Sequence, residues 1–128
     1  MKCLIVEDNP EMRRLLKWLL HDLTAEITEC SDGDEALAAY EAQAPDWVLM
    51  DLQMERMDGI TATRALMAAY PHAKVIVVTD YDDANLRQAA SQAGAIAYLL
   101  KENLTELQSV ITAAAPGTRT ERALNKQG

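Results

Sequence analysis

The sequence predicts an α/β fold in which one parallel sheet is covered by helices on both faces. Short apolar runs of strand type alternate five times with longer stretches of helical spacing. Such alternation is typical of parallel strands joined by right-handed crossovers. Three of the runs, Leu4–Val6, Val48–Met50 and Val75–Val78, are apolar at every position. Central strands that are buried on both sides have this character.

The chain has the size and composition of one domain. Its 128 residues are 49% hydrophobic and 25% charged, which suffices for one core but not for two. A net charge of −8 disfavours binding to nucleic acid and to anionic membrane surfaces. No apolar run approaches the roughly 18–20 residues of a membrane span. The first apolar run soon ends at two carboxylates, unlike a signal peptide. We therefore expect a soluble, cytoplasmic domain.

The five strands are expected where β-branched and other apolar residues cluster: Cys3–Val6, Ile27–Cys30, Trp47–Met50, Val75–Val78 and Ile96–Leu100. The first helix is expected from about Pro10, with one apolar face formed by Met12, Leu16, Leu19 and Leu23. Trp18 lies about 200° around that helix from Leu16, on the solvated face. Because tryptophan often anchors interfaces, we predict that Trp18 contacts a partner protein.

Turn and capping residues mark the remaining helices. Asp32-Gly33-Asp34 is a turn with an N-cap before the second helix, and Asp58-Gly59 precedes the third. Pro71 ends the third helix, and Gly94 is the expected C-cap of the fourth. The last helix is expected over about Leu104–Ala114.

We divide the chain into a domain over residues 1–115 and a polar tail or linker over residues 116–128. Within the second segment, Thr118 and Glu121 could form a capping box for one short extra helix. Cys3 and Cys30 are too few for a zinc site or a disulfide framework. We expect both to be buried free thiols.

Chemically complementary side chains follow the expected strands. Glu7 and Asp8 follow the first strand, Asp51 the third, Thr79 the fourth and Lys101 the fifth. The carboxyl ends of parallel strands meet at one edge of a sheet, so these side chains should converge. Crowded carboxylates repel one another unless a cation joins them, and their oxygens suit Mg²⁺. The set favours attack of an aspartate on a phosphoryl group whose oxygens a metal and a lysine neutralise.

Several segments occur in a familiar order and spacing: Leu4–Asp8, Val48–Met54 with Met57–Gly59, Val77–Thr79, and Gly94–Lys101. Together they resemble the receiver domain of bacterial two-component response regulators over residues 2–115. The resemblance implies a doubly wound, flavodoxin-like (βα)5 fold, similar to that of chemotaxis regulators. It also implies the strand order 2-1-3-4-5.

The resemblance implies a role for each residue of the site. Asp51 would be the phosphoacceptor, and Thr79 and Lys101 would bind the phosphoryl oxygens. The implied Mg²⁺ ligands are Glu7, Asp8, Asp51 and the backbone carbonyl of Gln53. Tyr98 and Thr79 would form the switch that responds to phosphorylation.

Three positions depart from the family pattern. Glu55 and Glu102 stand where proline is common, so we expect a looser loop after the third strand and no cis peptide at Lys101–Glu102. Asp80 replaces a small residue and adds a charge beside the site. Its carboxylate should either turn to solvent or pair with a cation, for which Arg87 is one candidate. The Leu-Leu-Lys-Glu segment resembles the subfamily whose members carry a helix-turn-helix output domain.

The resemblance implies a signalling switch and no conventional metabolic enzyme. A sensor histidine kinase or a histidine phosphotransfer protein would donate the phosphoryl group. A downstream protein or a C-terminal output domain would receive the signal, and self-association into a homodimer is a further option. The expected catalysis is limited to the domain's own phosphorylation and dephosphorylation.

Three other functions remain as alternatives. A haloacid-dehalogenase-like phosphatase also forms an aspartyl phosphate, but its nucleophile follows the first strand in an Asp-x-Asp pattern that Glu7-Asp8-Asn9 does not match. A flavodoxin-like FMN carrier would need a Ser/Thr/Gly-rich loop after that strand. A degenerate receiver would bind a partner without phosphorylation, although no key residue is missing here.

Overall fold

A computed structural model describes residues 1–23 and 26–113. Its strands are β1 (Lys2–Val6), β2 (Glu26–Cys30), β3 (Trp47–Met50), β4 (Val75–Thr79) and β5 (Ala97–Leu100). They pair in parallel in the order β2-β1-β3-β4-β5. The predicted fold class and strand order are therefore confirmed. The segment 116–128, with its suggested short helix, lies outside the described residues.

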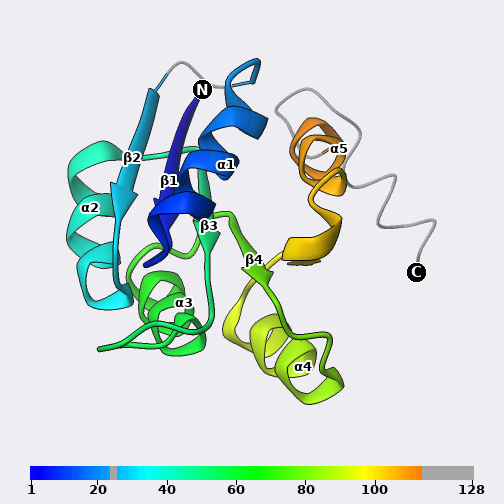
Figure 1. The fold of residues 1–128 in the computed structure, drawn as a ribbon. Helices are drawn as coiled ribbons and strands as arrows, with labels where there is room; N and C mark the ends of the chain where they lie inside the picture. Colours follow the sequence, from blue (N-terminus) through cyan, green and yellow to red (C-terminus); the bar gives the residue numbers. More distant parts are fainter. Residues whose placement is uncertain (24–25, 114–128) are drawn as a thin grey trace.

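The helices cover both faces of the sheet. They are α1 (Pro10–Leu20), α2 (Ala36–Gln43), α3 (Gly59–Ala69), α4 (Ala84–Ala93) and α5 (Glu106–Ala113), with 3-10 turns η1 (Gly33–Glu35) and η2 (Lys101–Asn103). Figure 1 shows α1 and α5 on one face of the sheet and α2, α3 and α4 on the other. This arrangement follows from right-handed crossovers between parallel strands.

Successive strand residues pack on opposite faces, which produces a core on each side of the sheet. The buried cluster beneath α1 and α5 includes Ile5, Leu16, Leu49, Ile76 and Ile111. The cluster beneath α2 and α3 includes Leu4, Val48, Leu66 and Val75. Burial on both faces explains why the central strands are apolar throughout.

Most element ends lie within a residue or so of the sequence predictions, and three of the differences change the place of an apolar residue. α1 ends at Leu20, where the His21 N–H donates to the Trp18 carbonyl, so Leu23 packs against the core from beyond the helix. Ile96 precedes β5 and is 50% exposed, so its assignment to the strand was wrong. Leu104 is buried just before α5 instead of within it. An apolar pattern reports burial, and burial continues past the hydrogen-bonded ends of an element.

The caps predicted for α3 and α4 are present, whereas the Asp32 side chain caps the 3-10 turn η1 and not α2, whose N-cap residue Glu35 makes no side-chain cap hydrogen bond. The Asp58 carboxylate accepts a hydrogen bond from the Thr61 N–H at the start of α3. Gly94 ends α4 with a φ of 114°, a conformation that favours glycine. Cys3 and Cys30 are buried free thiols, as expected, and burial raises the pKa of Cys3 to about 12.

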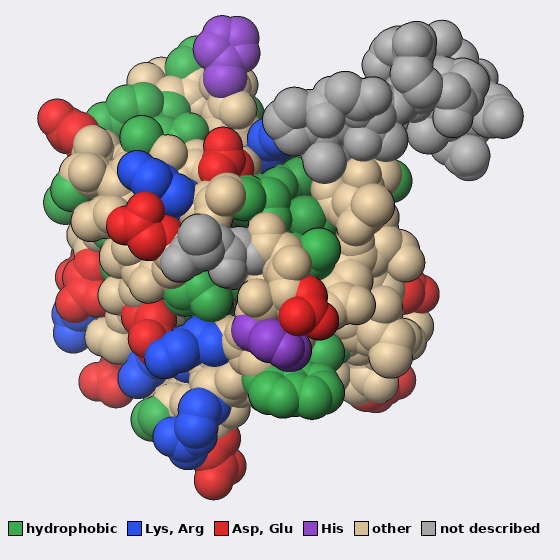
Figure 2. Space-filling view, turned by 90° about the horizontal axis from the view of Figure 1, so that it is seen from above, with side chains coloured by type: hydrophobic (Ala, Val, Ile, Leu, Met, Phe, Trp, Pro, Cys, Tyr) green, Lys and Arg blue, Asp and Glu red, His purple; other side chains and the backbone are tan. Residues whose placement is uncertain are grey.

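The surface at the amino-terminal end of the sheet carries charges of both signs. At the amino-terminal end, acidic and basic side chains lie interspersed, as Figure 2 shows. The acidic site described below lies at the carboxyl end. Among the described residues, no helix has the length and apolar character needed to cross a membrane.

Candidate functional site

Three polar residues at the carboxyl edge of the sheet are buried. Glu7 follows β1, Asp51 follows β3, and Thr79 is the last residue of β4. Their exposed fractions are 1%, 3% and 0%, respectively. The backbone ladder continues through two of them, because the Glu7 N–H donates to the Cys30 carbonyl and the Asp51 N–H to the Val6 carbonyl. These acids are therefore held by the sheet itself.

Lys101 supplies a positive charge between the two buried acids. It follows β5, and its side chain is only 11% exposed. The Lys101 Nζ lies 3.1 Å from Glu7 Oε1 and 3.3 Å from Asp51 Oδ1. The predicted convergence of these strand ends is thus observed.

The burial of these charges alters their proton affinities. Burial, together with the Asp51 charge, raises the pKa of Glu7 to about 7, and Lys101 opposes this rise. Burial also raises the pKa of Asp51, again against the effect of Lys101. Burial alone would lower the pKa of Lys101, but the Asp51 and Glu7 carboxylates hold it above its usual value. Lys101 alone does not fully offset the repulsion and burial of the two carboxylates, so a further cation would stabilise their charged forms.

Asp8 completes a cluster of three carboxylates. It is exposed, and one oxygen each of Glu7, Asp8 and Asp51 lie within 4.8 Å of one another. In the described part of the chain, Glu7 Oε1 is buried without a well-aligned hydrogen bond. Two buried acids beside one open to solvent match the preference of Mg²⁺ for few carboxylates and several retained waters. The residues therefore fit this ion.

Gln53 contributes to the site through its backbone. It lies in the loop that connects β3 to α3, and its backbone hydrogen bond to the Asp51 carboxylate favours the charged form of that acid. The Gln53 side chain is exposed. A metal-binding role for its carbonyl stays a prediction.

The same loop is joined to the turn after β2 by Asp32. The Asp32 carboxylate is 2% exposed and accepts hydrogen bonds from the backbone N–H groups of Arg56 and Met57, each at 2.8 Å. Burial alone would raise the pKa of Asp32, but these bonds hold it below its usual value. From the sequence alone, Asp32 is predicted only to be a turn and capping residue. The available signal was its place after a strand, at the same sheet edge as the other acids.

Two of the departures from the family pattern, Glu55 and Glu102, concern the backbone. Despite Glu55, the loop after β3 is tethered through Asp32. No peptide bond within residues 1–23 and 26–113 is cis, as expected for Lys101–Glu102.

Asp80 turns to solvent, and the suggested pairing with Arg87 is wrong. Asp80 is exposed. The Arg87 guanidinium binds the Asp82 carboxylate at 3.1 Å instead. Asp82 lies two residues after Asp80 and is the acid that is close enough to pair with Arg87.

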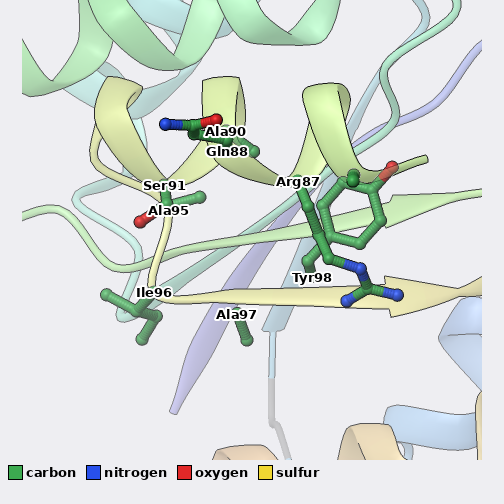
Figure 3. Close-up of a pocket in the computed structure, with 9 residues that line it drawn as sticks. Arg87, Gln88, Ala90, Ser91, Ala95, Ile96, Ala97 and Tyr98 are labelled. Atoms are coloured by element: carbon green, nitrogen blue, oxygen red, sulfur yellow. The ribbon is translucent and has the colours of Figure 1, made fainter. Parts of the chain in front are cut away.

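Tyr98 lies half-buried on β5 and contacts the loop after β4. Its hydroxyl donates to the Tyr81 carbonyl at 2.6 Å, while the Tyr81 N–H donates to Thr79 Oγ1 at 3.2 Å. The Arg87 guanidinium lies 4.5 Å from the Tyr98 ring centroid. Figure 3 shows these two side chains at one end of a pocket of about 440 Å³ between α4 and β5. The proposed switch residues are thus linked through Tyr81.

Trp18 occupies the surface position that the helical spacing predicts. Its side chain is 66% exposed, whereas Leu16 is 1% exposed. Its ring centroid lies 6.0 Å from that of His21 on the same side of α1. Its role in partner contact stays a prediction.

Known proteins are similar to this chain in both sequence and fold. The family described as "Response regulator receiver domain" matches residues 3–112. An uncharacterized transcriptional regulatory protein of Bacillus subtilis, YxjL, is 35% identical over 117 residues, covering 88% of this chain and 53% of the relative. A protein-glutamate methylesterase/protein-glutamine glutaminase of Anaeromyxobacter dehalogenans is 43% identical over 103 residues, covering 78% of this chain and 30% of the relative.

A solved structure gives the same result. Chemotaxis protein CheY4 of Vibrio cholerae superposes with a TM-score of 0.81 at 25% identity, covering 89% of this chain and 98% of that protein. The chain spans about half the length of the Bacillus subtilis relative and about a third of the length of the Anaeromyxobacter dehalogenans relative. It belongs to the receiver domain family of two-component response regulators.

Proposed function

We propose that this receiver domain accepts a phosphoryl group on Asp51 and uses it to alter its surface. The observation that carries the proposal is the buried Asp51 carboxylate, 3.3 Å from the Lys101 ammonium and beside an acidic cluster open at Asp8. Lys101 compensates the charge of this nucleophile, and the exposed Asp8 lies on the solvent side of the same cluster.

The donor we propose is the phosphohistidine of a sensor histidine kinase or of a phosphotransfer protein. An oxygen of Asp51 forms the bond to phosphorus as the N–P bond breaks, and the imidazole keeps the electron pair. Lys101 and the Thr79 hydroxyl bind the phosphoryl oxygens. Mg²⁺, held by Glu7, Asp8, Asp51 and the Gln53 carbonyl, would offset the remaining negative charge of those oxygens.

The switch we propose passes from Thr79 to Tyr98. If Thr79 moves toward the phosphoryl group, its hydrogen bond from the Tyr81 N–H is altered, and Tyr81 in turn accepts from the Tyr98 hydroxyl. Tyr98 then turns inward, and the surface of α4, β5 and α5 changes. Phosphorylation thereby shifts the population between two states.

The same site supports a wider role in signalling. The domain acts in the cytoplasm as a phosphorylation switch and not as a metabolic enzyme, catalysing only its own phosphorylation and dephosphorylation. Its signal reaches a downstream protein or a C-terminal output domain. The relatives include both a transcriptional regulatory protein and a protein-glutamate methylesterase/protein-glutamine glutaminase.

The test is phosphorylation by a small-molecule donor. The protein is incubated with Mg²⁺ and acetyl phosphate or phosphoramidate, and its intact mass is measured. We expect a gain of one phosphoryl group that is lost in Asp51→Asn and in Asp8→Ala. Asp22→Asn, which alters an exposed acid at the end of α1, should be phosphorylated like the wild type. An unmodified wild-type protein would favour the degenerate receiver, and phosphate release from many substrates would favour a phosphatase.

We also propose that Trp18 contributes to a partner interface on α1. Exposed indole rings that become buried at the centre of an interface often contribute more than about 1 kcal/mol to binding. Trp18→Ala should therefore weaken binding to the cognate kinase or phosphotransfer protein, or self-association into a homodimer. Leu37→Ala, at an exposed apolar position on α2, is the control. Unchanged affinity and sedimentation in Trp18→Ala would remove Trp18 from the interface.

A further inference from the structure

We propose that Asp32 is a positioning residue that fixes the loop carrying the phosphoacceptor. This inference rests on the proposed function of Asp51. Asp32 lies at the turn between β2 and α2, outside the cluster of site residues. Its carboxylate nevertheless holds the backbone of the loop over residues 51–58, here called the acceptor loop.

The contacts between the turn and the acceptor loop use both backbone and side chains. Asp32 Oδ2 accepts from the Arg56 N–H and Oδ1 from the Met57 N–H, groups 24 and 25 residues further along the chain. The Arg56 side chain reaches back, with Nε 2.7 Å from Asp34 Oδ2 and Nη2 3.1 Å from Asp34 Oδ1. Asp32 is 2% exposed and its two hydrogen bonds to the loop are part-buried, whereas the Arg56 side chain is 57% exposed. The two hydrogen bonds to Asp32 should therefore contribute more than the exposed ion pair.

The turn that contains Gly33 and the acceptor loop pack so closely that a side chain at Gly33 would not fit between them. A Cβ atom at Gly33 would lie 2.6 Å from the Met57 carbonyl oxygen. At the other end of the loop, a Cβ at Gly59 would lie 2.0 Å from the Asp51 carbonyl oxygen, and the Gly59 N–H donates to the Leu52 carbonyl. The acceptor loop is thus fixed at its base by Gly59 and in its middle by Asp32.

The loop bears two groups whose placement determines reactivity. Asp51 opens it, and Gln53 hydrogen-bonds the Asp51 carboxylate through its backbone. A ligand carbonyl on a loose loop binds a cation weakly, because the ion must then order the loop. Residues that orient a metal ligand from outside typically affect affinity or activity about 10- to 100-fold.

An aspartate is required at position 32 because both backbone donors need an acceptor. In Asp32→Asn one oxygen still accepts, but the amide group turns its own N–H toward the second donor. The acceptor loop should then loosen while every reacting group remains in the chain. Arg56→Ala is the matched control, because it removes the ion pair with Asp34 and keeps the Arg56 N–H that binds Asp32.

The experiment compares wild type, Asp32→Asn and Arg56→Ala at several Mg²⁺ concentrations, with phosphoramidate as donor and intact mass as readout. We expect Asp32→Asn to raise the half-saturating Mg²⁺ concentration about 10-fold or more, and Arg56→Ala to stay within about 2-fold. Mg²⁺ binding without donor, measured by calorimetry, should weaken in parallel. Asp83→Ala removes the side chain that accepts from the Leu86 N–H at the N-cap of α4, so it should lower stability without altering the Mg²⁺ dependence.

Amide hydrogen exchange keeps the inference testable if Asp32→Asn folds poorly. In the wild type, the Arg56 and Met57 amides should be protected and the Glu55 amide much less so. Unprotected Arg56 and Met57 amides would overturn the inference, as would an Asp32→Asn protein with wild-type Mg²⁺ dependence. If the wild type is not phosphorylated at all, the proposed function fails. The exchange data then still show whether Asp32 holds the Arg56 and Met57 amides.

Discussion

The acceptor loop and the loop over residues 80–83 lie at the same edge of the sheet but are held in different ways. The acceptor loop is fixed by two hydrogen bonds to the buried Asp32 and by the close approach of Gly59 to Asp51. Every residue from Asp80 to Asp83 is exposed. That second loop is joined to its surroundings through Tyr98 and the pair between Arg87 and Asp82.

The energies of these contacts differ accordingly. A hydrogen bond to a charged group typically contributes about 1.5–3 kcal/mol, and an unsatisfied buried donor costs a similar amount. An exposed ion pair contributes about 0–1 kcal/mol. Phosphorylation can therefore rearrange the second loop at little cost while the acceptor loop stays in place. Under the proposed function, the acceptor loop is then a rigid half of the site that would receive the phosphoryl group, and the loop over residues 80–83 is a labile half that would respond.

The largest effect is expected when the rigid half loses Lys101. Lys101→Ala leaves the buried Glu7 and Asp51 without their counter-charge, a change that typically costs about 3–5 kcal/mol. The folded-state pKa of Glu7, about 7, already exceeds its usual 4.5, so the acid destabilises the fold progressively as pH rises between these values. Without Lys101 the pKa values of both acids rise further. The stability difference between Lys101→Ala and the wild type should thus increase as pH rises through the pKa of Glu7.

Urea denaturation across this pH range measures the difference. Lys17→Ala removes an exposed pair with Glu29 and is the control, with an expected loss below about 1 kcal/mol. If Lys101→Ala lowers the free energy of unfolding by the same amount at every pH, then the charges of Glu7 and Asp51 do not interact with the Lys101 ammonium.

A smaller effect is expected from Asp80 in the labile half. Two like charges about 6 Å apart repel by roughly 3 kcal/mol at an effective dielectric constant near 20, and water screens an exposed group further. Asp80→Ala should therefore be phosphorylated by phosphoramidate faster, or retain the group longer, by about 2- to 10-fold at low salt. The difference should shrink in high salt. Rates equal to those of the wild type at low ionic strength would show that Asp80 does not influence the site.

The smallest effect on stability is expected from Tyr98→Phe. This change removes the hydrogen bond to Tyr81 and keeps the ring beneath Arg87, so it should cost about 1 kcal/mol or less. Asp51 should still be phosphorylated in Tyr98→Phe and in Tyr98→Ala, while Tyr98→Ala should weaken binding of the downstream partner. Loss of phosphorylation in either variant would assign Tyr98 a structural role in the site instead.

The convergence of the site was predictable because strand order and strand ends determine it. Glu7, Asp51, Thr79 and Lys101 each follow or end an apolar strand, and parallel strands bring such positions to one edge. The exposure of Trp18 followed equally well from helical spacing. In both cases a backbone repeat determines where the side chain lies.

The tether through Asp32 and the pairing of Arg87 could not be predicted in this way. Both depend on how loops fold relative to one another, and loop positions do not follow a repeat. Asp32 carries an ordinary turn signal, yet its carboxylate serves the acceptor loop. Asp80 and Asp82 both lie a few residues before Arg87 in the sequence, so either could pair with it. The conformation of the loop places Asp82, and not Asp80, next to the Arg87 guanidinium.

The most direct test follows amide hydrogen exchange before and after phosphorylation of the wild-type protein with Mg²⁺ and phosphoramidate. Amides in the loop over residues 80–83 and at Tyr98 should change their exchange rates on phosphorylation. The Arg56 and Met57 amides should keep their protection, because Asp32 holds them in both states. Equal changes in both loops, or no change in either, would contradict a rigid acceptor half and a labile responding half.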